Sequence, residues 1–541
     1  MSRAVSNLFA ASRGNFFPRG AGSILSGVIR HPSVRAIPGL QLAQSGILLS
    51  EMNKHVVVSR HSRRTFIKYG SLALGAALGG PYLVRGQNLN SRLNIAQVGV
   101  GGKGGSDLQC NASAGENIVA LCDINSDFLD RVKKNAPNIP TYQDWRQLFD
   151  KQKDIDAVDI AIPDHNHAIV AATAIKLGKH VYCQKPLTHD VYEARMLRDL
   201  ARQYKVATQM GNQGSASNGL RRAVEVVQAG LIGPVHQAYV WTNRPVWPQG
   251  LDRPPGDDPV PANLNWDNWL GTAPNRPYKD QWPADIQAAH NGLLRYSKEV
   301  YQPFNWRGWQ DFGTGALGDM ACHTCNWPFR ALKLGYPTEI EASSTGINTE
   351  MYPNKSRIRF EFPAREGLPA VTLNWSDGGN QPPSDVTADV EALLGKISTS
   401  GCIMVGEKGM VYSGDDGDQQ LHFYVKLKGD TEMMDSSKHP EVAKIPETLP
   451  RNVFMARYAD KGIQPDQAHH MEWIAACKSG QHETAYSNFD IAAYLTEIIL
   501  LGCVALRAGK KLEWDGPNMT ATNDSDVAQL VKRQYRAGWT A

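Results

Sequence analysis

The chain has 541 residues, which is too long for one compact core and leaves room for two domains and a terminal extension. With 42% hydrophobic and 20% charged residues, the composition excludes a disordered or fibrous chain. Residues 1–86 carry eleven Lys or Arg against Glu51 alone, so the formal charge of +4 leaves about −6 for the rest. Such a body offers no basic patch for phosphates, and we expect no nucleic-acid partner.

A basic segment near the N-terminus resembles a twin-arginine export signal. Arg63 and Arg64 precede a small, apolar run over residues 69–84 that is marginal for a stable membrane span. The resemblance implies export by the twin-arginine machinery into the periplasm, with cleavage near Gly86. Met52 is an alternative start, and a chance Arg pair before a buried helix is the alternative interpretation.

From residue 93, short β-branched runs alternate with helical periodicity. Strands are expected over 93–98, 117–123, 156–163, 180–184 and 206–210. This alternation predicts an α/β fold with a parallel, doubly wound Rossmann sheet that binds a dinucleotide. We place this domain at residues 87–211, after an extension over 1–86.

The remaining residues, 212–541, have a different pattern. A Pro- and Trp-rich stretch over 245–309 lacks helix or strand periodicity and is expected to be a functional loop or lid. Consecutive strands then predict an α+β domain with a large, mostly antiparallel open sheet, for substrate binding and oligomerisation. The strands are expected over 338–346, 357–362, 370–375, 402–406, 409–413 and 422–427, and two helices over 467–478 and 490–508.

The eight cysteines are expected to be free thiols. Cys122 and Cys183 fall at predicted inner strand ends, where a free Cys packs as a small hydrophobe. Cys322 and Cys325 have CxxC spacing, but they lie in a predicted helix and lack the following His of a haem site. We therefore expect packing roles and predict no metal site.

A glycine-rich loop follows the first predicted strand and opens a helix. Gly99, Gly101 and Gly104 stand in G-x-G-x-x-G register, and Gly102 lies in the same loop. Amides of such a loop approach a pyrophosphate closely. Asp123, nineteen residues after Gly104, ends the second strand, where a carboxylate accepts hydrogen bonds from ribose hydroxyls and repels a 2′-phosphate. The predicted cofactor is NAD rather than NADP; the alternative is a glycine turn beside an unrelated Asp.

Polar residues follow two later strands at their carboxyl ends, where open α/β sheets bind ligands. The segments 162–167 (IPDHNH) and 184–186 (QKP) resemble the T-P-N-x-x-H and E-K-P motifs of the Gfo/Idh/MocA oxidoreductases. The family is named for glucose-fructose oxidoreductase and inositol dehydrogenase, and the resemblance covers about residues 91–515. Asp164 replaces the Asn and Gln184 the Glu of the family motifs. The resemblance implies cofactor-binding roles for Pro163, His167, Gln184 and Lys185.

A further motif, over residues 318–326, resembles the family's G-D-x-G-x-H-x-x-D, with Ala321 and Asn326 as departures. Asp319 and His323 are four apart and share one helix face. The resemblance implies a catalytic group of Lys185, Asp319 and His323. His323 suits the role of base, Asp319 would orient its imidazole, and Lys185 would hydrogen-bond the reacting oxygen. The alternative is an exposed helical ion pair.

Trp306 and Arg307 precede this motif and suggest a sugar-binding platform, in which an indole stacks on the sugar and Arg binds hydroxyls or a carboxylate. They could equally belong to the core. Overall we expect an exported NAD-dependent oxidoreductase that removes hydride from a hydroxyl carbon of a sugar, cyclitol or sugar derivative. The resemblance also implies a homo-oligomer. Alternatives are a redox-assisted glycosidase or lyase that keeps NAD bound, and a non-catalytic NAD-binding protein.

Overall fold

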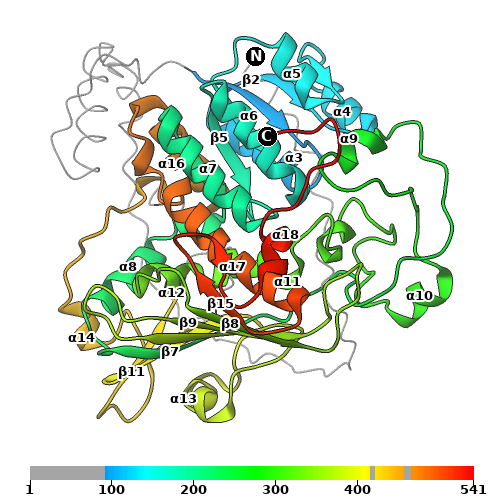
Figure 1. The fold of residues 1–541 in the computed structure, drawn as a ribbon. Helices are drawn as coiled ribbons and strands as arrows, with labels where there is room; N and C mark the ends of the chain where they lie inside the picture. Colours follow the sequence, from blue (N-terminus) through cyan, green and yellow to red (C-terminus); the bar gives the residue numbers. More distant parts are fainter. Residues whose placement is uncertain (1–91, 415–420, 456–464) are drawn as a thin grey trace, which may run out of the picture. The chain divides into compact units, whose positions relative to one another are not determined.

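The computed structural model describes residues 92–414, 421–455 and 465–541. The twin-arginine segment, the alternative start at Met52 and the boundary near Gly86 lie outside the described residues. Two sheets dominate the described chain, and their topology confirms the predicted α/β class, with a parallel Rossmann sheet followed by a mostly antiparallel one (Figure 1).

The first sheet has six strands in the order β3-β2-β1-β4-β5-β6, and all its pairs are parallel. Its strands are β1 (Asn94–Val98), β2 (Asn117–Cys122), β3 (Thr141–Tyr142), β4 (Ala157–Ile160), β5 (His180–Gln184) and β6 (Thr208–Gly211). The connecting helices are α3 (Lys103–Ser113), α4 (Ser126–Lys133), α5 (Trp145–Lys151), α6 (His167–Lys176) and α7 (Val191–Tyr204). The strand order reverses between β1 and β4, so a ligand crevice is expected at their carboxyl ends.

The second sheet has ten strands, in the order β14-β13-β12-β11-β7-β10-β9-β8-β15-β16. They are β7 (Val235–Trp241), β8 (Glu339–Ser344), β9 (Ser356–Phe362), β10 (Val371–Ser376), β11 (Gly401–Gly406), β12 (Gly409–Ser413), β13 (Tyr424–Leu427), β14 (Met434–Asp435), β15 (Leu512–Asp515) and β16 (Thr520–Ala521). The β7–β10 pair is parallel, and the other pairs are antiparallel, as predicted. The last strand of the first sheet ends at Gly211, but the domain boundary there stays a prediction.

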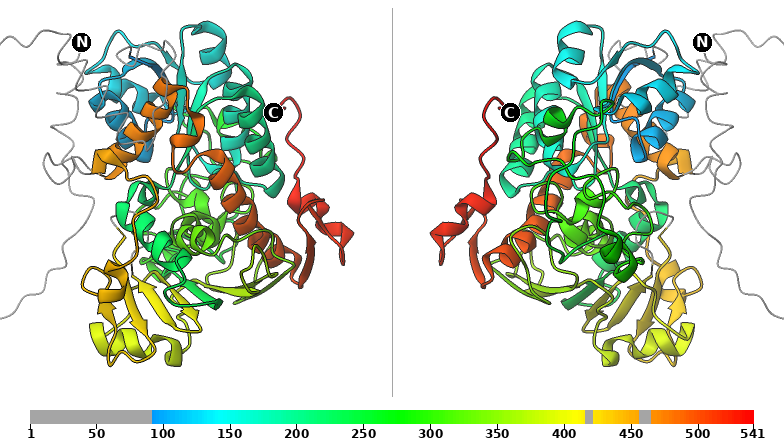
Figure 2. Two further views of the ribbon diagram at one scale, coloured as in Figure 1. Left: turned by 90° about the vertical axis from the view of Figure 1, so that its left-hand side faces the viewer. Right: turned by 90° about the vertical axis from the view of Figure 1, so that its right-hand side faces the viewer.

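Helices cover one face of the second sheet. They are α8 (Asn218–Gln228), α11 (Gly315–Thr324), α12 (Asn326–Ala331) and α17 (Phe489–Ala508), and they share one apolar core with the strands. Helix α13 (Ser384–Leu394), which the sequence did not predict, lies on the other side (Figures 1 and 2). Its Val390 belongs to the same buried apolar cluster as Trp241. In β9 the residues alternate between buried Phe360 and exposed Arg359, so part of that outer face is open. Pairing of copies through it stays a prediction.

Within the described part of the chain, helix α17 is long and apolar enough to cross a membrane, judged by length and composition. Of its most apolar 18-residue stretch, 83% is buried inside the fold. The described chain also contains the 15-residue helix α16 (Pro465–Ser479) and the short helices α14 (Pro440–Ala443) and α18 (Ala528–Val531). Helix α16 packs against α3.

The segment over 245–309 is more ordered than expected. It contains α9 (Trp266–Leu270), α10 (Ala284–Ala289) and a 3-10 turn at Asn305–Gly308. Its aromatic residues, which include Trp269, Trp282, Tyr301 and Trp309, form a small core together with Phe312. The expectation of a stretch without helix was wrong because these aromatics are irregularly spaced, so their packing gives no periodic signal.

Candidate functional site

The glycine loop packs tightly between β1, α3 and β4. A Cβ on Gly104 would lie 2.2 Å from the carbonyl oxygen of Gly99, and one on Gly99 would lie 2.2 Å from that of Ala161. At Gly102, which has φ +51°, nothing lies within 4 Å of a Cβ position. The loop is therefore crowded toward the sheet and open on its other side, which fits the close approach of a pyrophosphate.

Asp123 lies beside this loop, as predicted for a residue at the ribose position. Its Oδ2 accepts from the amide of Val100 at 2.9 Å and from that of Gly101 at 3.3 Å, and its Oδ1 accepts from Asn125. Burial raises the pKa of the Asp123 carboxyl, although these amide hydrogen bonds oppose the rise. The carboxylate thus fixes the conformation of the loop, and its contact with the ribose stays a prediction.

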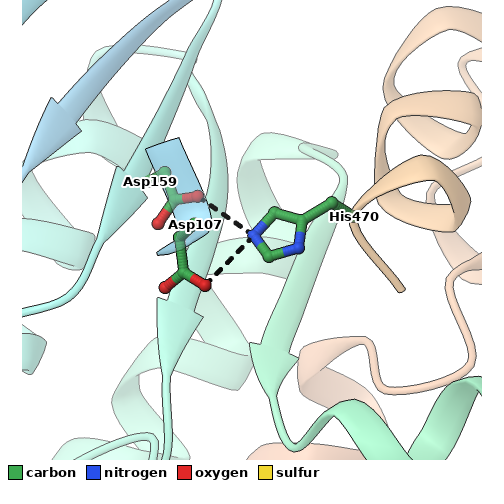
Figure 3. Close-up of side chains that lie close together, drawn as sticks. All are labelled: Asp107, Asp159 and His470. Atoms are coloured by element: carbon green, nitrogen blue, oxygen red, sulfur yellow. Dashed lines mark ion pairs between the residues drawn. The ribbon is translucent and has the colours of Figure 1, made fainter. Parts of the chain in front are cut away.

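Lys103 of the glycine loop belongs to a buried ionic network that the sequence did not predict. Its Nζ pairs with Asp466 of α16 and lies 3.1 Å from Oδ1 of Asp107. Nε2 of His470 lies 3.3 Å from Asp159 and 3.6 Å from Asp107 (Figure 3). Burial lowers the pKa of His470, but its interactions with Asp159, Cys110 and Asp107 outweigh burial and raise that pKa well above its usual range.

This cluster of two carboxylates and one imidazole has the ligand types of a metal site. The carboxylates already have partners in the chain, because Lys103 pairs with Asp107 and Asn111 donates to Asp159 at 2.7 Å. We therefore treat the cluster as an ion-pair network. It also reaches the strand ends, because Nε2 of Gln184 donates to Oδ2 of Asp107 at 2.7 Å.

His167 connects the two predicted strand-end motifs. Its ring nitrogens lie 2.8 Å from the carbonyl oxygen of Pro186 and 2.7 Å from that of Ile162. The imidazole is buried. Its two contacts connect the segment that contains Pro163 with the segment that contains Lys185. Its contact with the cofactor stays a prediction.

Lys185 and Asp319 meet directly. The ammonium of Lys185 lies 2.8 Å from Oδ1 of Asp319 and 3.2 Å from the Asp319 carbonyl oxygen. Nε of Arg307 donates to the same Oδ1 at 3.1 Å. Burial raises the pKa of Asp319, but these two cations outweigh it and hold that pKa well below its usual value.

Helix α11 presents Asp319 and His323 one turn apart, both buried. His323 contributes to the electrostatic environment of Asp319, in the direction that lowers the pKa of the carboxyl. The structure therefore brings the predicted group of Lys185, Asp319 and His323 together. The structure also shows Arg307 as a direct partner of the Asp319 carboxylate. The sequence had predicted only that Asp319 orients the imidazole of His323.

Asp164, which stands where the family motif has Asn, is a second acid in this region. Its Oδ2 accepts from Oγ1 of Thr314 at 2.9 Å, and its buried Oδ1 has no hydrogen-bond partner among the described residues. Burial raises the pKa of Asp164 to about 8, and the charge of Asp319 acts in the same direction. This shift was not predictable from the sequence, because burial is its main cause.

Arg307 rests on aromatic rings at the edge of the site. Its guanidinium carbon lies 4.4 Å from the ring centroid of Trp306 and 4.5 Å from that of Phe304. Trp306 is 8% exposed and belongs to the aromatic core of the segment. Trp306 therefore supports Arg307 from the core, and its stacking on a sugar stays a prediction.

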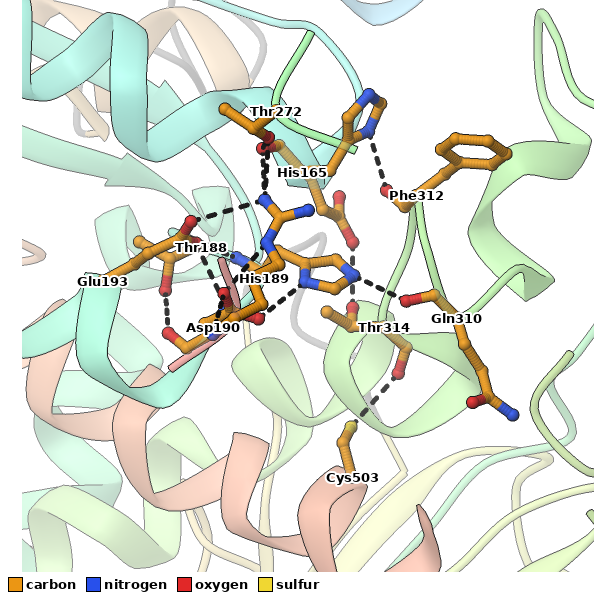
Figure 4. Close-up of polar contacts among 12 residues, drawn as sticks. His165, Thr188, His189, Asp190, Glu193, Thr272, Gln310, Phe312, Thr314 and Cys503 are labelled. Atoms are coloured by element: carbon orange, nitrogen blue, oxygen red, sulfur yellow. Dashed lines mark hydrogen bonds and ion pairs between the residues drawn. The ribbon is translucent and has the colours of Figure 1, made fainter. Parts of the chain in front are cut away.

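A second buried network joins the strand ends to the segments around them (Figure 4). His189 lies 2.8 Å from Asp190 and 2.9 Å from the carbonyl oxygen of Gln310. Arg533, near the C-terminus, donates to Asp190 at 2.9 Å and to the carbonyl oxygen of His165 at 2.7 Å. The sequence offered no signal for this contact.

The eight cysteines are all free and buried, including Cys322 and Cys325. Burial raises the pKa of Cys322 to about 12, which disfavours a reactive thiolate. Packing roles therefore account for both.

Parts of the chain are similar in sequence to known proteins. Levoglucosan dehydrogenase of Pseudarthrobacter phenanthrenivorans is 25% identical over 181 residues, which are 33% of this chain and 33% of that protein. A glycosyl hydrolase family 109 protein of Solibacter usitatus is 31% identical over 154 residues, 25% of this chain and 35% of that protein. The matches thus span about a third of these curated relatives.

The fold resembles that of an inositol dehydrogenase homologue from Azotobacter vinelandii, solved with NADH and myo-inositol. The TM-score is 0.50 at 13% identity, over 79% of this chain and 98% of that one. Residues 93–212 match the model of the Gfo/Idh/MocA oxidoreductase family with its NAD-binding Rossmann fold. Residues 93–212 therefore resemble the NAD-binding Rossmann domain of the Gfo/Idh/MocA oxidoreductases.

Proposed function

We propose that this protein is an NAD-dependent oxidoreductase that oxidises a hydroxyl of a sugar, cyclitol or sugar derivative by hydride transfer. The observation that carries the proposal is the meeting of Lys185 with Asp319, one helical turn from His323. These residues come from distant parts of the chain, and converging titratable groups of this kind mark catalytic sites. The relative named levoglucosan dehydrogenase supports the substrate class.

The glycine loop and Asp123 would hold the dinucleotide, because the loop is open at Gly102 and its amides are fixed by the Asp123 carboxylate. The bound NAD supplies the hydride acceptor. His323 takes the proton of the substrate hydroxyl. Lys185 donates a hydrogen bond to the same oxygen and stabilises its developing negative charge. Asp319 holds Lys185 in place and balances its charge.

The test is a pair of single variants and their combination. We expect His323→Ala to bind NAD normally but to lose about 100-fold or more in turnover, the scale of a positioned acid–base group. Lys185→Ala should lose a similar factor, and the double variant should lose less than the product of the two because both residues act on one event. NADH formation with levoglucosan, myo-inositol and D-glucose is the readout. His236→Ala, on the surface, is the matched control; full activity in His323→Ala would refute the proposed role.

A second candidate is a redox-assisted glycosidase or lyase, favoured by the relative named as a glycosyl hydrolase family 109 protein. It would use the same residues, but the hydride would return to the substrate. Release of NADH during turnover supports the dehydrogenase, and cleavage of a glycoside without net NADH supports this second candidate. A non-catalytic NAD-binding protein would show neither reaction.

We also propose that the protein is exported by the twin-arginine machinery to the periplasm with NAD already bound, because that pathway carries folded cargo and the cofactor is made in the cytoplasm. The basis is the Arg63-Arg64 pair before its apolar run. Replacing both with Lys should trap the protein inside the cell. Normal export of that variant, measured by fractionation, would contradict the signal.

A further inference from the structure

The charges around Asp319 do not balance. Lys185 and Arg307 both bind the same carboxylate oxygen, Oδ1 of Asp319, at 2.8 and 3.1 Å. Two cations therefore share one anion. Their side chains keep 17% and 21% of their surface exposed, so both can meet a ligand.

Within residues 92–414, 421–455 and 465–541, the other titratable groups nearby do not supply the missing negative charge. Asp164 is held in its neutral form up to about pH 8 by burial, as its raised pKa shows. Gln184 is uncharged, and His167 and His323 can add only positive charge. The site therefore has an excess of about one positive charge near neutral pH.

Arg276, in the same aromatic segment, provides an internal comparison. It also lies over aromatic rings, at 5.3 Å from the centroid of Trp309. Its guanidinium, however, pairs with two carboxylates, Asp311 and Glu350. Arg276 therefore has two carboxylates of its own, whereas Arg307 shares the single carboxylate of Asp319 with Lys185.

The free edge of Arg307 suits a carboxylate. Its Nε is used by Asp319, and its Nη1 donates to the carbonyl oxygen of Phe304 at 3.1 Å. Nη2 donates no hydrogen bond within the described residues, so its two hydrogens and one on Nη1 remain available. These hydrogens form the fork that binds a carboxylate through two hydrogen bonds. The rings of Trp306 and Phe304 hold the guanidinium plane in place.

We propose that the substrate is a sugar acid, such as a uronate or aldonate, whose carboxylate pairs with Arg307 while its hydroxyl lies at His323 and Lys185. This inference rests on the proposed function and specifies its substrate class. In the reaction the C–H bond breaks and its electron pair leaves as hydride to NAD⁺, the hydroxyl proton passes to His323, and a C=O bond forms. The carboxylate stays unchanged. A neutral sugar would leave Arg307 without its second anion, which is how a site discriminates between ligands of similar shape.

The experiment compares substrates that differ in charge but little in shape. With wild-type protein and NAD, kcat/KM is measured for uronates and aldonates, for their methyl esters or lactones, and for the neutral parent sugars. We expect the acids to be favoured by roughly tenfold or more, the scale of a charge-assisted hydrogen bond. Binding of D-glucuronate and of its methyl ester to the NADH-loaded protein is measured in parallel, so that a slow reaction is not mistaken for lack of recognition.

Variants then assign the preference to Arg307. In Arg307→Gln the ratio of acid to ester should fall to near one, whereas Arg307→Lys should keep part of it. Arg276→Gln is the control and should keep the wild-type ratio. Equal kcat/KM and equal binding for acids and esters in the wild type would overturn the sugar-acid inference but leave the oxidoreductase proposal standing. Absence of NAD-linked oxidation with acids and neutral sugars alike would overturn both.

Discussion

The ammonium of Lys185 lies 2.8 Å from Oδ1 of Asp319, and this contact joins the end of β5 to helix α11. Because the same carboxylate binds Arg307, Asp319 positions two cations rather than one. The position of Lys185 relative to a bound hydroxyl therefore depends on Asp319.

We predict that Asp319→Asn lowers kcat by about 100-fold. The variant removes the carboxylate that holds the Lys185 ammonium, and a displacement of a catalytic group by about 1 Å lowers the rate by a factor of this size. NAD affinity should change little, since Asp319 lies outside the glycine loop. Asp319→Glu should recover part of the loss by restoring the charge. Steady-state kinetics and a titration with NAD check both statements, and a fully active Asp319→Asn would contradict them.

The Rossmann sheet was predictable because its signals are local. Each buried strand is a short apolar run, and the glycine loop and Asp123 stand at fixed distances from the first strand. The pairing of Asp319 with His323 on one face was also predictable from their spacing. Lys185 entered the site only through resemblance to a family motif, since a lone Lys at a strand end carries no signal of its own.

The contacts made across long stretches of chain were not predictable. Lys103 pairs with Asp466, and Arg533 with Asp190, over more than three hundred residues each. Neither pair belongs to a periodic pattern, and the burial that makes them important follows from tertiary packing. The raised pKa of Asp164 has the same origin, because it comes from burial rather than from a neighbouring residue in the sequence.

Arg533 should be a strong contributor to stability. It pairs with both Asp190 and Glu193, which are buried at the start of α7 (Figure 4). We predict that Arg533→Gln lowers the free energy of unfolding by about 3–5 kcal/mol, because it leaves buried carboxylates without their cation. Arg202→Gln removes a solvent-exposed pair with Asp490 and should cost at most about 1 kcal/mol. Urea unfolding of both variants tests the contrast, and equal losses would contradict it.

Cofactor choice should depend on Asp123. The wild-type protein should bind NAD more tightly than NADP, because a 2′-phosphate would face this carboxylate. Asp123→Asn keeps an acceptor for the loop amides but removes the charge, so we predict a shift of the affinity ratio toward NADP of about tenfold or more, since like charges in contact cost several kcal/mol. Asp127→Asn, an exposed neighbour on α4, is the control. Titrations with both dinucleotides measure the ratio, and tighter NADP binding by the wild type would show that Asp123 does not lie at the ribose.

Asp164 should make stability depend on pH. Its pKa is raised from 3.8 to about 8 in the folded protein by burial and by Asp319, although Thr314, Arg307 and Lys185 oppose the rise. Between these two values the folded state keeps a proton that the unfolded chain has lost. The contribution of this group is therefore complete below about pH 4 and is lost progressively as the pH rises to about 8.

We predict that Asp164→Asn, which resembles the protonated carboxyl in shape and charge, removes this dependence. The variant and the wild type should have similar unfolding midpoints below about pH 4, where the carboxyl is protonated in both the folded and the unfolded wild type. Near pH 9 the variant should be the more stable of the two, because only the wild type then has an ionised carboxylate buried in the fold. All other titrating groups are common to both proteins, so their effects cancel in the difference. Thermal unfolding of both across this range is the measurement, and parallel curves would show that Asp164 is already ionised in the folded protein.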